Sequence, residues 1–573
     1  MQWDSFSTRI KLVAIFVTII GAGIIVRLFF LQVVHGSDFR NEADTRYQSK
    51  ASDVINRGTI YFTKKDGTLV TTATVASGFQ VEIQSKSITD TGILYDKLAP
   101  HIADQISRED FIAKIVPGTN QYRVVARKLN KEQADAISVL KEPGVVVKVD
   151  KWRFYPGELL ASHVLGFLGF SDNGQNGRYG IERSYEAVLS HTAESLYVNF
   201  FAEVFANIKS TVFENDEADG DVVTSIEPFV QATLEKELAD TKATWSADGA
   251  GGIVMDPVTG EILAMAYTPG FNPNEYGKQT DVAVYANPNV ESVFEFGSVI
   301  KPLVMAGALD AGVVTKDTTY TDKGFVKVGD RTINNFDKIG RGPGTTMQDV
   351  LNQSLNTGMV FVEQKLGKTA FKKYLLSYQI AEKTDIDLPG EVASLTSNLE
   401  GNRDVELANA AFGQGIALTP IEAIRAFSAL GTGGKLPWPH VGKEIKYEFS
   451  TKTLEYPAPL VVAWKPEISE KITDMLVTVG EGVMKTYHVS VPHHSIAMKT
   501  GTAQMANLTA GGYFADKYMH SMFAYFPAYS PKFIVFMYVK NPRGAKFAAQ
   551  TLANPMVDTA NFLLNYYNIA PDK

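Results

Sequence analysis

The chain has 573 residues, of which 45% are hydrophobic and 21% charged, so it is a folded protein too long for a single core. Its net charge of −8, with no long basic run, excludes nucleic acid as an expected partner. There are no cysteines, which excludes disulfides and cysteine-ligated zinc. The adjacent pair His493-His494 has no third ligand at helical or strand spacing, so no metal site is expected.

An apolar run over residues 12–34 follows a short polar tail, residues 1–11. As one helix the run is about 35 Å long, enough to cross a hydrocarbon layer of about 30 Å. No small-residue cleavage site follows it, so the run is predicted to be a retained transmembrane anchor rather than a removed signal peptide. Because the tail is so short, we expect the large C-terminal part to lie outside the cytoplasm.

Residues 35–221 mix strand and helix patterns. The apolar and polar alternation over 79–83 predicts a strand, and 129–140 is helical in composition. An aromatic cluster lies within 194–213, for which a buried core and a contact with a partner or membrane both remain open. The acidic, turn-rich stretch 214–221 predicts a domain boundary.

The remaining residues, 222–573, carry the clearest secondary-structure patterns. Those patterns predict a helix over 226–238, a strand, turn and strand over 251–265, strands over 498–503, 522–526 and 533–539, and a closing helix over 556–567. The last three strands are expected to be neighbours in one antiparallel sheet.

The chemistry-bearing stretch is Phe294 to Pro302, which contains Ser298 and Lys301. If a helix opens here, the two side chains lie one turn apart on one face, so the lysine amine can take the serine proton and make it a nucleophile. Pro302 is compatible with a helix start, because amides of the first turn have no intrahelical acceptor. The pattern alone is weak, since Ser138 and Lys141 share it, and exposed helix faces often do.

Two later elements raise the weight of Ser298. These are Ser354-x-Asn356 and Lys499-Thr500-Gly501, which follow in order and at suitable distances. The ordered set resembles the signature of the penicillin-binding protein and serine β-lactamase superfamily. Further landmarks resembling the class B penicillin-binding proteins are Arg57-Gly58-Thr59-Ile60, Gly180-Ile181-Glu182, Gly413-Gln414-Gly415-Ile416 and Lys499 to Gln504.

The resemblance implies an α+β protein with a single N-terminal transmembrane helix, a mixed α/β pedestal domain, and a transpeptidase domain whose central antiparallel sheet is flanked by helices. The implied divisions are a cytoplasmic tail at 1–11, the anchor at 12–34, the non-catalytic pedestal at 35–221 and the transpeptidase domain at 222–573. The segment between anchor and pedestal is too short for the glycosyltransferase domain of class A relatives.

Carried over residue by residue, the resemblance implies a peptidoglycan D,D-transpeptidase. Ser298 attacks the carbonyl of a D-Ala-D-Ala stem peptide and holds the acyl group, and Lys301 is the base. Ser354 relays the proton to the departing D-alanine, while Asn356 hydrogen-bonds Lys301 and the substrate amide. No cofactor is implied.

The resemblance also implies a substrate-binding strand. Lys499 supplies positive charge for the terminal carboxylate, Thr500 and Thr502 supply hydroxyl donors, and Gly501 lets substrate backbone lie along the strand. The amides of Ser298 and Thr502 form an oxyanion hole, typically worth about 3 kcal/mol per donor. Two positions depart from the family, because Met498 stands where glycine is usual and Phe296 where proline is usual.

Two other readings use the same residues. A D,D-carboxypeptidase or β-lactamase would pass the acyl group to water. An anchor and a pedestal favour the cross-linking enzyme, because a β-lactamase needs neither. A non-catalytic scaffold or β-lactam sensor would bind without turnover, against which the intact Lys301, Asn356 and Lys499 argue. The resemblance implies stem peptides as substrates, β-lactams as inhibitors, and a membrane-embedded glycan polymerase of the SEDS family as partner. The septal, cell-division branch is favoured over the elongation branch.

Overall fold

The structure is a computed structural model, and it describes residues 56–171, 174–190, 220–401, 403–507 and 511–573. The expected anchor at 12–34 and the aromatic cluster at 194–213 lie outside these ranges. Among the described residues, no helix combines the length and apolarity needed to span a bilayer. The described chain forms two compact units, one of residues 77–152 and one of residues 56–76 and 153–573.

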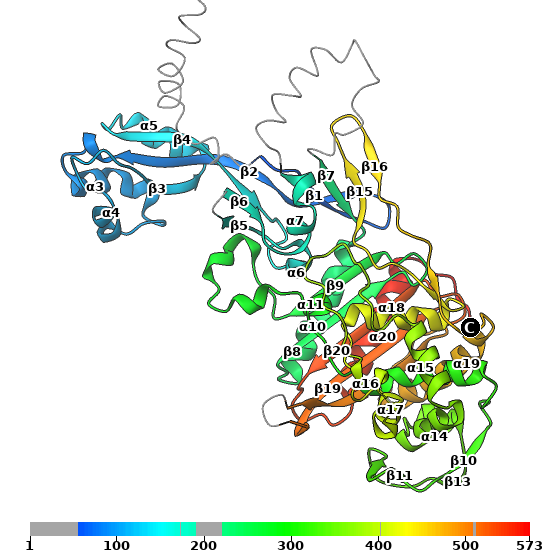
Figure 1. The fold of residues 1–573 in the computed structure, drawn as a ribbon. Coiled ribbons are helices and arrows are strands. Elements are labelled where there is room, and N and C mark those ends of the chain that lie inside the picture. Colours follow the sequence, from blue (N-terminus) through cyan, green and yellow to red (C-terminus); the bar gives the residue numbers. More distant parts are fainter. Residues whose placement is uncertain (1–55, 172–173, 191–219, 402, 508–510) are drawn as a thin grey trace, which may run out of the picture. The chain divides into compact units, whose positions relative to one another are not determined.

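The smaller unit packs helices against a short antiparallel sheet (Figure 1). The expected helix over 129–140 is found, and it starts where Asn130 and Gln133 form a reciprocal cap with backbone amides. Apolar side chains from the strands and helices, among them Val81, Leu98 and Phe111, form its core. Its elements are β2 (Leu69–Gln84), η3 (Ser85–Ser87), α3 (Thr91–Ile102), α4 (Arg108–Lys114), β3 (Tyr122–Leu129), α5 (Lys131–Val139) and β4 (Val145–Phe154).

The larger unit is built on a five-stranded antiparallel sheet in the order β18-β19-β20-β8-β9. The three strands expected near the C-terminus are neighbours in this sheet, paired so that Lys499 lies opposite Phe523 and Thr502 opposite His520. Strands buried on both faces read as continuous apolar runs, which explains why they were visible in the sequence. The strands are β8 (Gly249–Met255), β9 (Ile262–Thr268), β18 (Ala497–Ala506), β19 (Tyr513–Phe526) and β20 (Phe533–Lys540).

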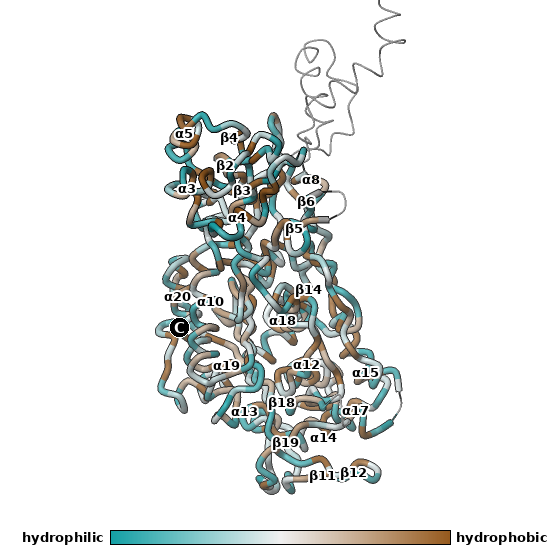
Figure 2. The backbone as a smooth tube through the Cα atoms, turned by 90° about the vertical axis from the view of Figure 1, so that its left-hand side faces the viewer, coloured by the Kyte–Doolittle hydropathy of each residue, from teal (hydrophilic) through white to brown (hydrophobic). Residues whose placement is uncertain are grey.

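Helices cover both faces of this sheet. On one face lie α10 (Pro228–Thr244) and α20 (Ala548–Tyr566), whose apolar residues share a core with Val254, Met522 and Val535. On the other face lie α12 (Lys301–Asp310) and α18 (Pro420–Gly431). Figure 2 shows hydrophobic residues predominating along α12, as expected for a helix buried on all sides.

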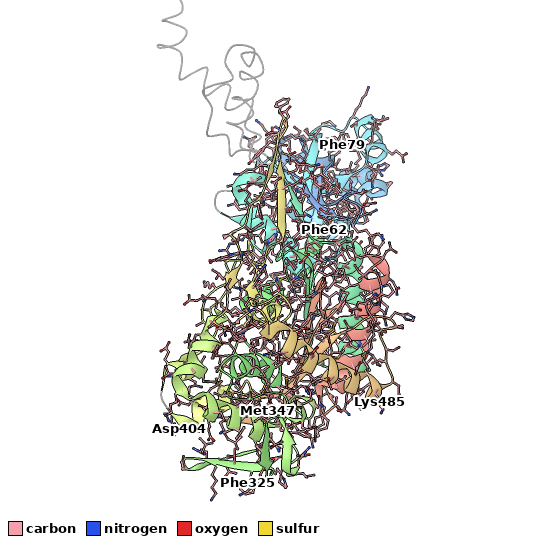
Figure 3. All side chains as sticks on the ribbon, turned by 90° about the vertical axis from the view of Figure 1, so that its right-hand side faces the viewer. Phe62, Phe79, Phe325, Met347, Asp404 and Lys485 are labelled. Atoms are coloured by element: carbon pink, nitrogen blue, oxygen red, sulfur yellow. The ribbon has the colours of Figure 1, made fainter. Side chains whose placement is uncertain are left out.

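The helix expected over 226–238 begins at Pro228 because the Glu227 carboxylate caps the amides of Phe229 and Val230. Thr346 and Asp349 form a reciprocal cap that starts α13 (Met347–Asn352). In Figure 3, Met347 is buried at the start of α13, whereas Phe325 is exposed on β11. The other elements around the second face are α14 (Asn356–Leu366), α15 (Lys368–Ser377), α16 (Ser397–Glu400), α17 (Asp404–Ala410), α19 (Ile468–Tyr487), β10 (Thr319–Asp322), β11 (Phe325–Val328), β12 (Arg331–Asn334) and β13 (Gly342–Thr346).

A second set of strands in the larger unit joins distant parts of the chain. β1 pairs in parallel with β7, and β7 pairs antiparallel with β15. The remaining elements of this unit are β1 (Ile60–Thr63), α6 (Ser162–Leu165), β5 (Leu168–Ser171), β6 (Gly174–Gly177), α7 (Gly180–Ser184), α8 (Glu186–Leu189), β7 (Asp221–Thr224), η4 (Pro273–Lys278), η5 (Val282–Tyr285), α11 (Pro288–Glu291), η6 (Gly297–Ile300), β14 (Lys435–Leu436), β15 (Gly442–Lys446), β16 (Thr451–Thr453) and β17 (Leu460–Val461).

Candidate active site

The segment that carries Ser298 is a single 3-10 turn, η6, followed directly by α12. The expected α-helix therefore begins at Lys301, one turn later than a start at Ser298. Pro302 lies in the first turn of α12, where it costs no hydrogen bond. Gly297, just before the serine, has a φ of +65°, a conformation that favours glycine.

Glycines let this segment dock closely on the edge of the sheet. A Cβ atom on Gly501 would lie 2.3 Å from the Phe296 carbonyl oxygen, and one on Gly413 would lie 2.1 Å from the Gly297 carbonyl oxygen. The Ser521 hydroxyl of β19 donates a hydrogen bond of 2.8 Å to the same Phe296 carbonyl. The backbone approach at Gly501 is therefore made by the segment that carries Ser298, which places η6 against β18.

The two residues that depart from the family pattern are both core residues. Phe296 is fully buried and packs edge-to-face on Phe536, with ring centroids 4.9 Å apart. Met498 is also fully buried, and a Cβ atom on Gly480 of α19 would lie 3.1 Å from its Cγ atom. Phe296 and Met498 thus belong to two different hydrophobic core clusters.

Lys301 is held by the loop and helix start that carry Ser354 and Asn356. Its Nζ donates to the Ser354 carbonyl at 2.6 Å and to Asn356 Oδ1 at 2.9 Å, and lies 3.2 Å from Ser354 Oγ. Ser354 occupies a left-handed backbone conformation, with φ of +54°, which is uncommon for a residue with a side chain. This conformation turns both the carbonyl and the hydroxyl of Ser354 toward the lysine.

Ser354 connects the two lysines of the site. Lys499 Nζ lies 3.1 Å from Ser354 Oγ and donates to the Thr500 carbonyl at 2.9 Å. One hydroxyl therefore contacts both amines, Lys499 on one side and Lys301 on the other. A hydroxyl donates one proton and accepts others, so this arrangement can pass a proton between the two sides of the site.

Both lysines are buried, with exposed fractions of 0% for Lys301 and 1% for Lys499. Burial lowers the pKa of Lys499 to about 7. Burial, together with the nearby charge of Lys499, holds the pKa of Lys301 well below its usual range. Both effects favour the neutral amine of Lys301, which is the protonation state that a general base requires.

The threonines of β18 lie on the opposite face of the strand from Lys499 and Gly501, because side chains alternate along a strand. Thr500 and Thr502 are partly exposed, whereas Lys499 and Gly501 are buried. The Thr502 hydroxyl accepts a hydrogen bond of 3.0 Å from the Ala548 amide at the start of α20. This contact leaves the hydroxyl proton of Thr502 available to a ligand on the partly exposed face.

The structure brings Lys301, Ser354, Asn356 and Lys499 into one connected cluster. Ser298 precedes this cluster by one 3-10 turn and is partly exposed. Within the described part of the chain, its hydroxyl has no hydrogen-bond partner. The expected serine-lysine hydrogen bond is thus not made here, and contacts of catalytic bases are often formed only when substrate binds.

The competing pair, Ser138 and Lys141, has a different environment. Ser138 is exposed near the end of α5, and its hydroxyl donates 2.7 Å back to the Ala134 carbonyl. Such a contact is common for helical serines and does not activate the oxygen. The lone pattern match at Ser138 is therefore an ordinary helix surface.

The sequence interpretation missed the groups that orient Asn356. Its Nδ2 donates 3.0 Å to the Asn334 carbonyl, and the neighbouring residues Asn335 and Thr357 are tied to the carboxylate of Asp322. A backbone carbonyl carries no residue-type signal, so the Asn334 contact is invisible in a sequence. Asp322, two residues before Gly324, is a turn signal that can be recognised in the sequence.

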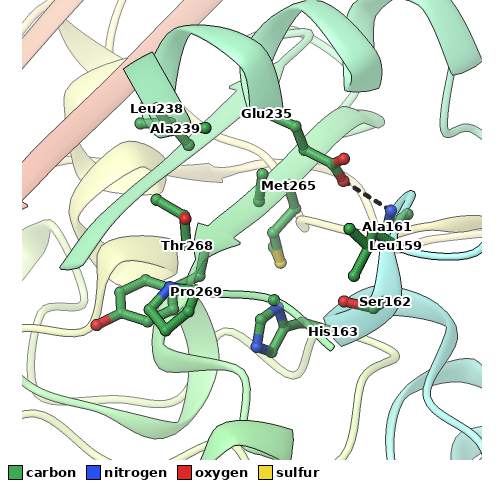
Figure 4. A pocket seen from close by; sticks show the side chains of 13 residues that line it. Leu159, Ala161, Ser162, His163, Glu235, Leu238, Ala239, Met265, Thr268 and Pro269 are labelled. Carbon is green, nitrogen blue, oxygen red and sulfur yellow. Dashed lines mark hydrogen bonds between the residues drawn. The ribbon is translucent and has the colours of Figure 1, made fainter. Parts of the chain in front are cut away.

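A cavity of about 300 Å³ lies elsewhere, beside β9 and α10 (Figure 4). The Glu235 carboxylate in its wall accepts a hydrogen bond of 2.7 Å from the Ala161 amide. Ser162 and His163 are adjacent there, but His163 Nε2 bonds to the Val284 carbonyl and not to the serine. Because β9 and β18 are opposite edges of the sheet, this cavity is separate from the lysine cluster.

In the described ranges, no group of three or more histidine, aspartate or glutamate side chains is placed to hold a metal ion. His494, from the adjacent histidine pair, uses both ring nitrogens against the carbonyls of Pro492 and Ile569.

Two family descriptions match the sequence. The one for the penicillin-binding protein transpeptidase domain matches residues 250–560, and the one for the penicillin-binding protein dimerisation domain matches residues 53–225. The transpeptidase match includes every residue of the lysine cluster.

Named relatives resemble the chain over most of its length. Stage V sporulation protein D of Bacillus subtilis is 31% identical over 565 residues, covering 96% of this chain and 84% of that protein. Peptidoglycan D,D-transpeptidase FtsI of Escherichia coli K12 is 26% identical over 454 residues, covering 78% and 73%.

Solved structures are similar in fold. Penicillin-binding protein 3 of Mycobacterium tuberculosis, complexed with aztreonam, has a TM-score of 0.64 at 25% identity, covering 74% of this chain and 92% of that one. Penicillin Binding Protein 2X from Streptococcus thermophilus has a TM-score of 0.72 at 20% identity, covering 90% and 80%.

Proposed function

The chain belongs to the class B penicillin-binding proteins, which combine a transpeptidase and a dimerisation domain, and from this membership we propose that it cross-links peptidoglycan stem peptides through a serine acyl-enzyme. The observation that supports the proposal best is the buried lysine pair joined by one serine hydroxyl. Two buried amines without a buried carboxylate between them favour a neutral base beside a positively charged anchor.

In the first step, Ser298 Oγ attacks the carbonyl carbon of the penultimate D-alanine while Lys301 Nζ takes the hydroxyl proton. The amides of Ser298 and Thr502 stabilise the oxyanion. The bond between that carbonyl carbon and the nitrogen of the terminal D-alanine then breaks. The proton reaches the leaving nitrogen through the Ser354 hydroxyl, and an ester on Ser298 remains.

In the second step, an amine of a neighbouring stem peptide attacks the ester carbonyl. Lys301 accepts a proton from the amine and returns it to Ser298 Oγ as the ester bond breaks, so the enzyme is regenerated and an amide cross-link is formed. Lys499, with the hydroxyls of Thr500 and Thr502, holds the donor's terminal carboxylate during the first step.

We further propose the cellular setting. Residues 12–34 anchor the protein in the cell membrane, residues 35–221 form the pedestal, and residues 222–573 form the transpeptidase domain outside the cytoplasm. The septal branch is preferred to the elongation branch, with a membrane-embedded SEDS-family glycan polymerase as partner. Support comes from the apolar run in the sequence and from relatives such as the E. coli transpeptidase FtsI.

Covalent labelling with a fluorescent penicillin tests the acyl-enzyme. The wild-type protein and Ser138→Ala are expected to label, and Ser298→Ala is expected not to. The Ser138 variant is the matched control, because it removes the other serine with a lysine three positions later. Labelling that persists in Ser298→Ala rejects the proposed nucleophile.

A second assay separates cross-linking from hydrolysis. A donor pentapeptide is mixed with an acceptor that carries a free amine, and the products are separated by chromatography. A cross-linked product is expected to accumulate as acceptor concentration rises, whereas release of tetrapeptide alone identifies a carboxypeptidase.

A further inference from the structure

Asp322, at the end of β10, is a buried carboxylate close to the active-site asparagine. It is 1% exposed and accepts five hydrogen bonds of 2.9 to 3.1 Å. The donors are the Asn335 amide group, which contacts both carboxylate oxygens, the Thr357 hydroxyl, and the backbone amides of Gly324 and Arg341. A buried charge is costly unless it is hydrogen-bonded, so this carboxylate fixes every group that it contacts.

The side chains of Asn335 and Thr357 are fixed twice. Asn335 Oδ1 accepts a hydrogen bond of 3.2 Å from the Thr357 amide, so the two residues are joined to each other as well as to Asp322. The Tyr320 hydroxyl lies 2.9 Å from the Thr357 hydroxyl. The single proton of Thr357 is used by two acceptors, Asp322 Oδ1 at 2.9 Å and Asn335 Oδ1 at 3.1 Å, so Tyr320 is the donor in its contact with Thr357.

Asn335 and Thr357 lie next to the residues that make the contacts of the Asn356 amide. Asn334 precedes Asn335, and its carbonyl accepts a hydrogen bond of 3.0 Å from Asn356 Nδ2. Asn356 precedes Thr357, and its Oδ1 accepts from Lys301 Nζ at 2.9 Å. With Nδ2 committed to a carbonyl, Oδ1 must face the lysine. A reversed amide would set two donors against each other.

We propose that Asp322 is a positioning residue for acylation, acting through Asn335 and Thr357 to fix the amide of Asn356 and thereby the amine of Lys301. The inference rests on the proposed function. A neutral amine has two N–H donors and one lone pair. The Ser354 carbonyl and Asn356 Oδ1 accept the two donors, which leaves the lone pair for a hydroxyl proton. Without Asn356 Oδ1, the amine is free to rotate and the lone pair loses its direction.

The test measures the second-order rate constant of acylation by a fluorescent penicillin, with saturation kinetics to separate binding from acylation. Asp322→Asn keeps the shape of the side chain, but its NH₂ group stands where a carboxylate oxygen accepts at least two of the five hydrogen bonds. We expect it to slow acylation at least about tenfold, with the binding constant little changed. Asn356→Ala is expected to be slower still. The double variant is expected to be no slower than Asn356→Ala, because residues acting through one group do not add.

The matched control is Asp387→Asn. Asp387 is also a carboxylate held by several donors, including the Tyr185 hydroxyl and the amides of Val441 and Gly442, but it lies outside the site. It is expected to lower the melting temperature without slowing acylation by the folded protein. If Asp322→Asn does not fold, Thr357→Val replaces it, and Thr357→Ser is expected to restore the rate.

The outcomes distinguish failure of the positioning role of Asp322 from failure of the proposed function. If Asn356→Ala is slow but Asp322→Asn and Thr357→Val acylate at the wild-type rate, the positioning role is wrong. Additive losses in the double variant also overturn it, since they indicate independent effects. If Asn356→Ala labels at the wild-type rate, the positioning role is wrong although the proposed function stands. If the wild type does not label, the proposed function fails and this inference falls with it.

Discussion

Two buried clusters in the larger unit differ in whether their charged side chains are paired with a side chain of opposite charge. In the first, Glu182 is fully buried between Arg57 and Arg153, with a hydrogen bond of 2.6 Å to each guanidinium Nε. In the second, Lys301 and Lys499 are equally buried but share a serine hydroxyl in place of a carboxylate. The first cluster stabilises the fold through paired charge. The second cluster has no paired carboxylate, so its amines can be neutral.

The pKa shifts follow the same division. Burial alone would raise the pKa of Glu182, but Arg153 and Arg57 hold it below its ordinary value, so the carboxylate stays charged. At the lysine pair burial is not opposed by a nearby acid, and both pKa values fall. A buried ionisable group whose charge is not compensated is a mark of chemistry rather than of structure, which is why the lysine cluster is the better functional candidate.

The largest expected effect is at the base. Replacing Lys301 with methionine keeps the buried volume but removes the amine, so acylation by penicillin should fall at least about a thousandfold, as general-base catalysis commonly contributes on this scale. Stopped-flow labelling measures the rate, and thermal unfolding checks the fold. A variant that acylates within tenfold of wild type would show that another group takes the serine proton.

The corresponding change in the paired cluster should act on stability. Glu182→Gln leaves two guanidinium groups buried without their carboxylate, which typically costs about 3–5 kcal/mol in free energy of unfolding. Urea denaturation measures it, and labelling of the folded fraction should be unchanged. Glu186→Gln is the control, because Glu186 is partly exposed and its carboxylate contacts only Arg57 among the two arginines. Equal losses in free energy of unfolding for Glu182→Gln and Glu186→Gln would show that burial of the Glu182 carboxylate does not determine its contribution to stability.

The two clusters predict changes in stability over different pH ranges. Lys499 has a folded pKa of about 7, lowered by burial, while an unfolded lysine titrates near about 10.4. The unfolded chain therefore holds an extra proton between these values, and the free energy of unfolding should rise with pH across that window. Glu182, with its lowered pKa, contributes stability that is lost as pH falls through the acidic range.

Activity should follow the charge on Lys499. Below about pH 7 the amine is charged and can hold a carboxylate, so the second-order acylation constant should fall about tenfold from pH 6 to pH 8. Lys499→Arg stays charged at all these pH values and should lose that decrease. A wild-type profile that is flat over this range would indicate that the charge of Lys499 is not required.

Much of the sheet was predictable because its strands are buried on both faces and read as apolar runs, as in 522–526 and 533–539. The order of Ser298, Ser354 and Lys499 predicted one site, and the structure joins Lys301, Ser354, Asn356 and Lys499. The roles of these residues stay predictions until they are tested. The expected anchor at 12–34 lies outside the described residues.

The rest of the site could not be read from the sequence, because it depends on long-range contacts with backbone groups. The Asn334 carbonyl and the Ala548 amide hold Asn356 and Thr502, yet backbone atoms are the same at every position. The late start of α12 likewise depends on how Gly297 fits against β18, a close approach that only the assembled sheet creates.

The smallest expected effect lies at the edge of the paired cluster. The Tyr155 hydroxyl donates 3.1 Å to Glu182 Oε1 and accepts from the Leu168 amide at 3.2 Å. Tyr155→Phe removes both contacts but leaves Arg57 and Arg153 paired with Glu182. The loss should therefore be about 1–2 kcal/mol, well below that of Glu182→Gln, with the penicillin labelling rate unchanged. A loss as large as that of Glu182→Gln would mean that the tyrosine, and not the arginine pairing, stabilises the buried carboxylate.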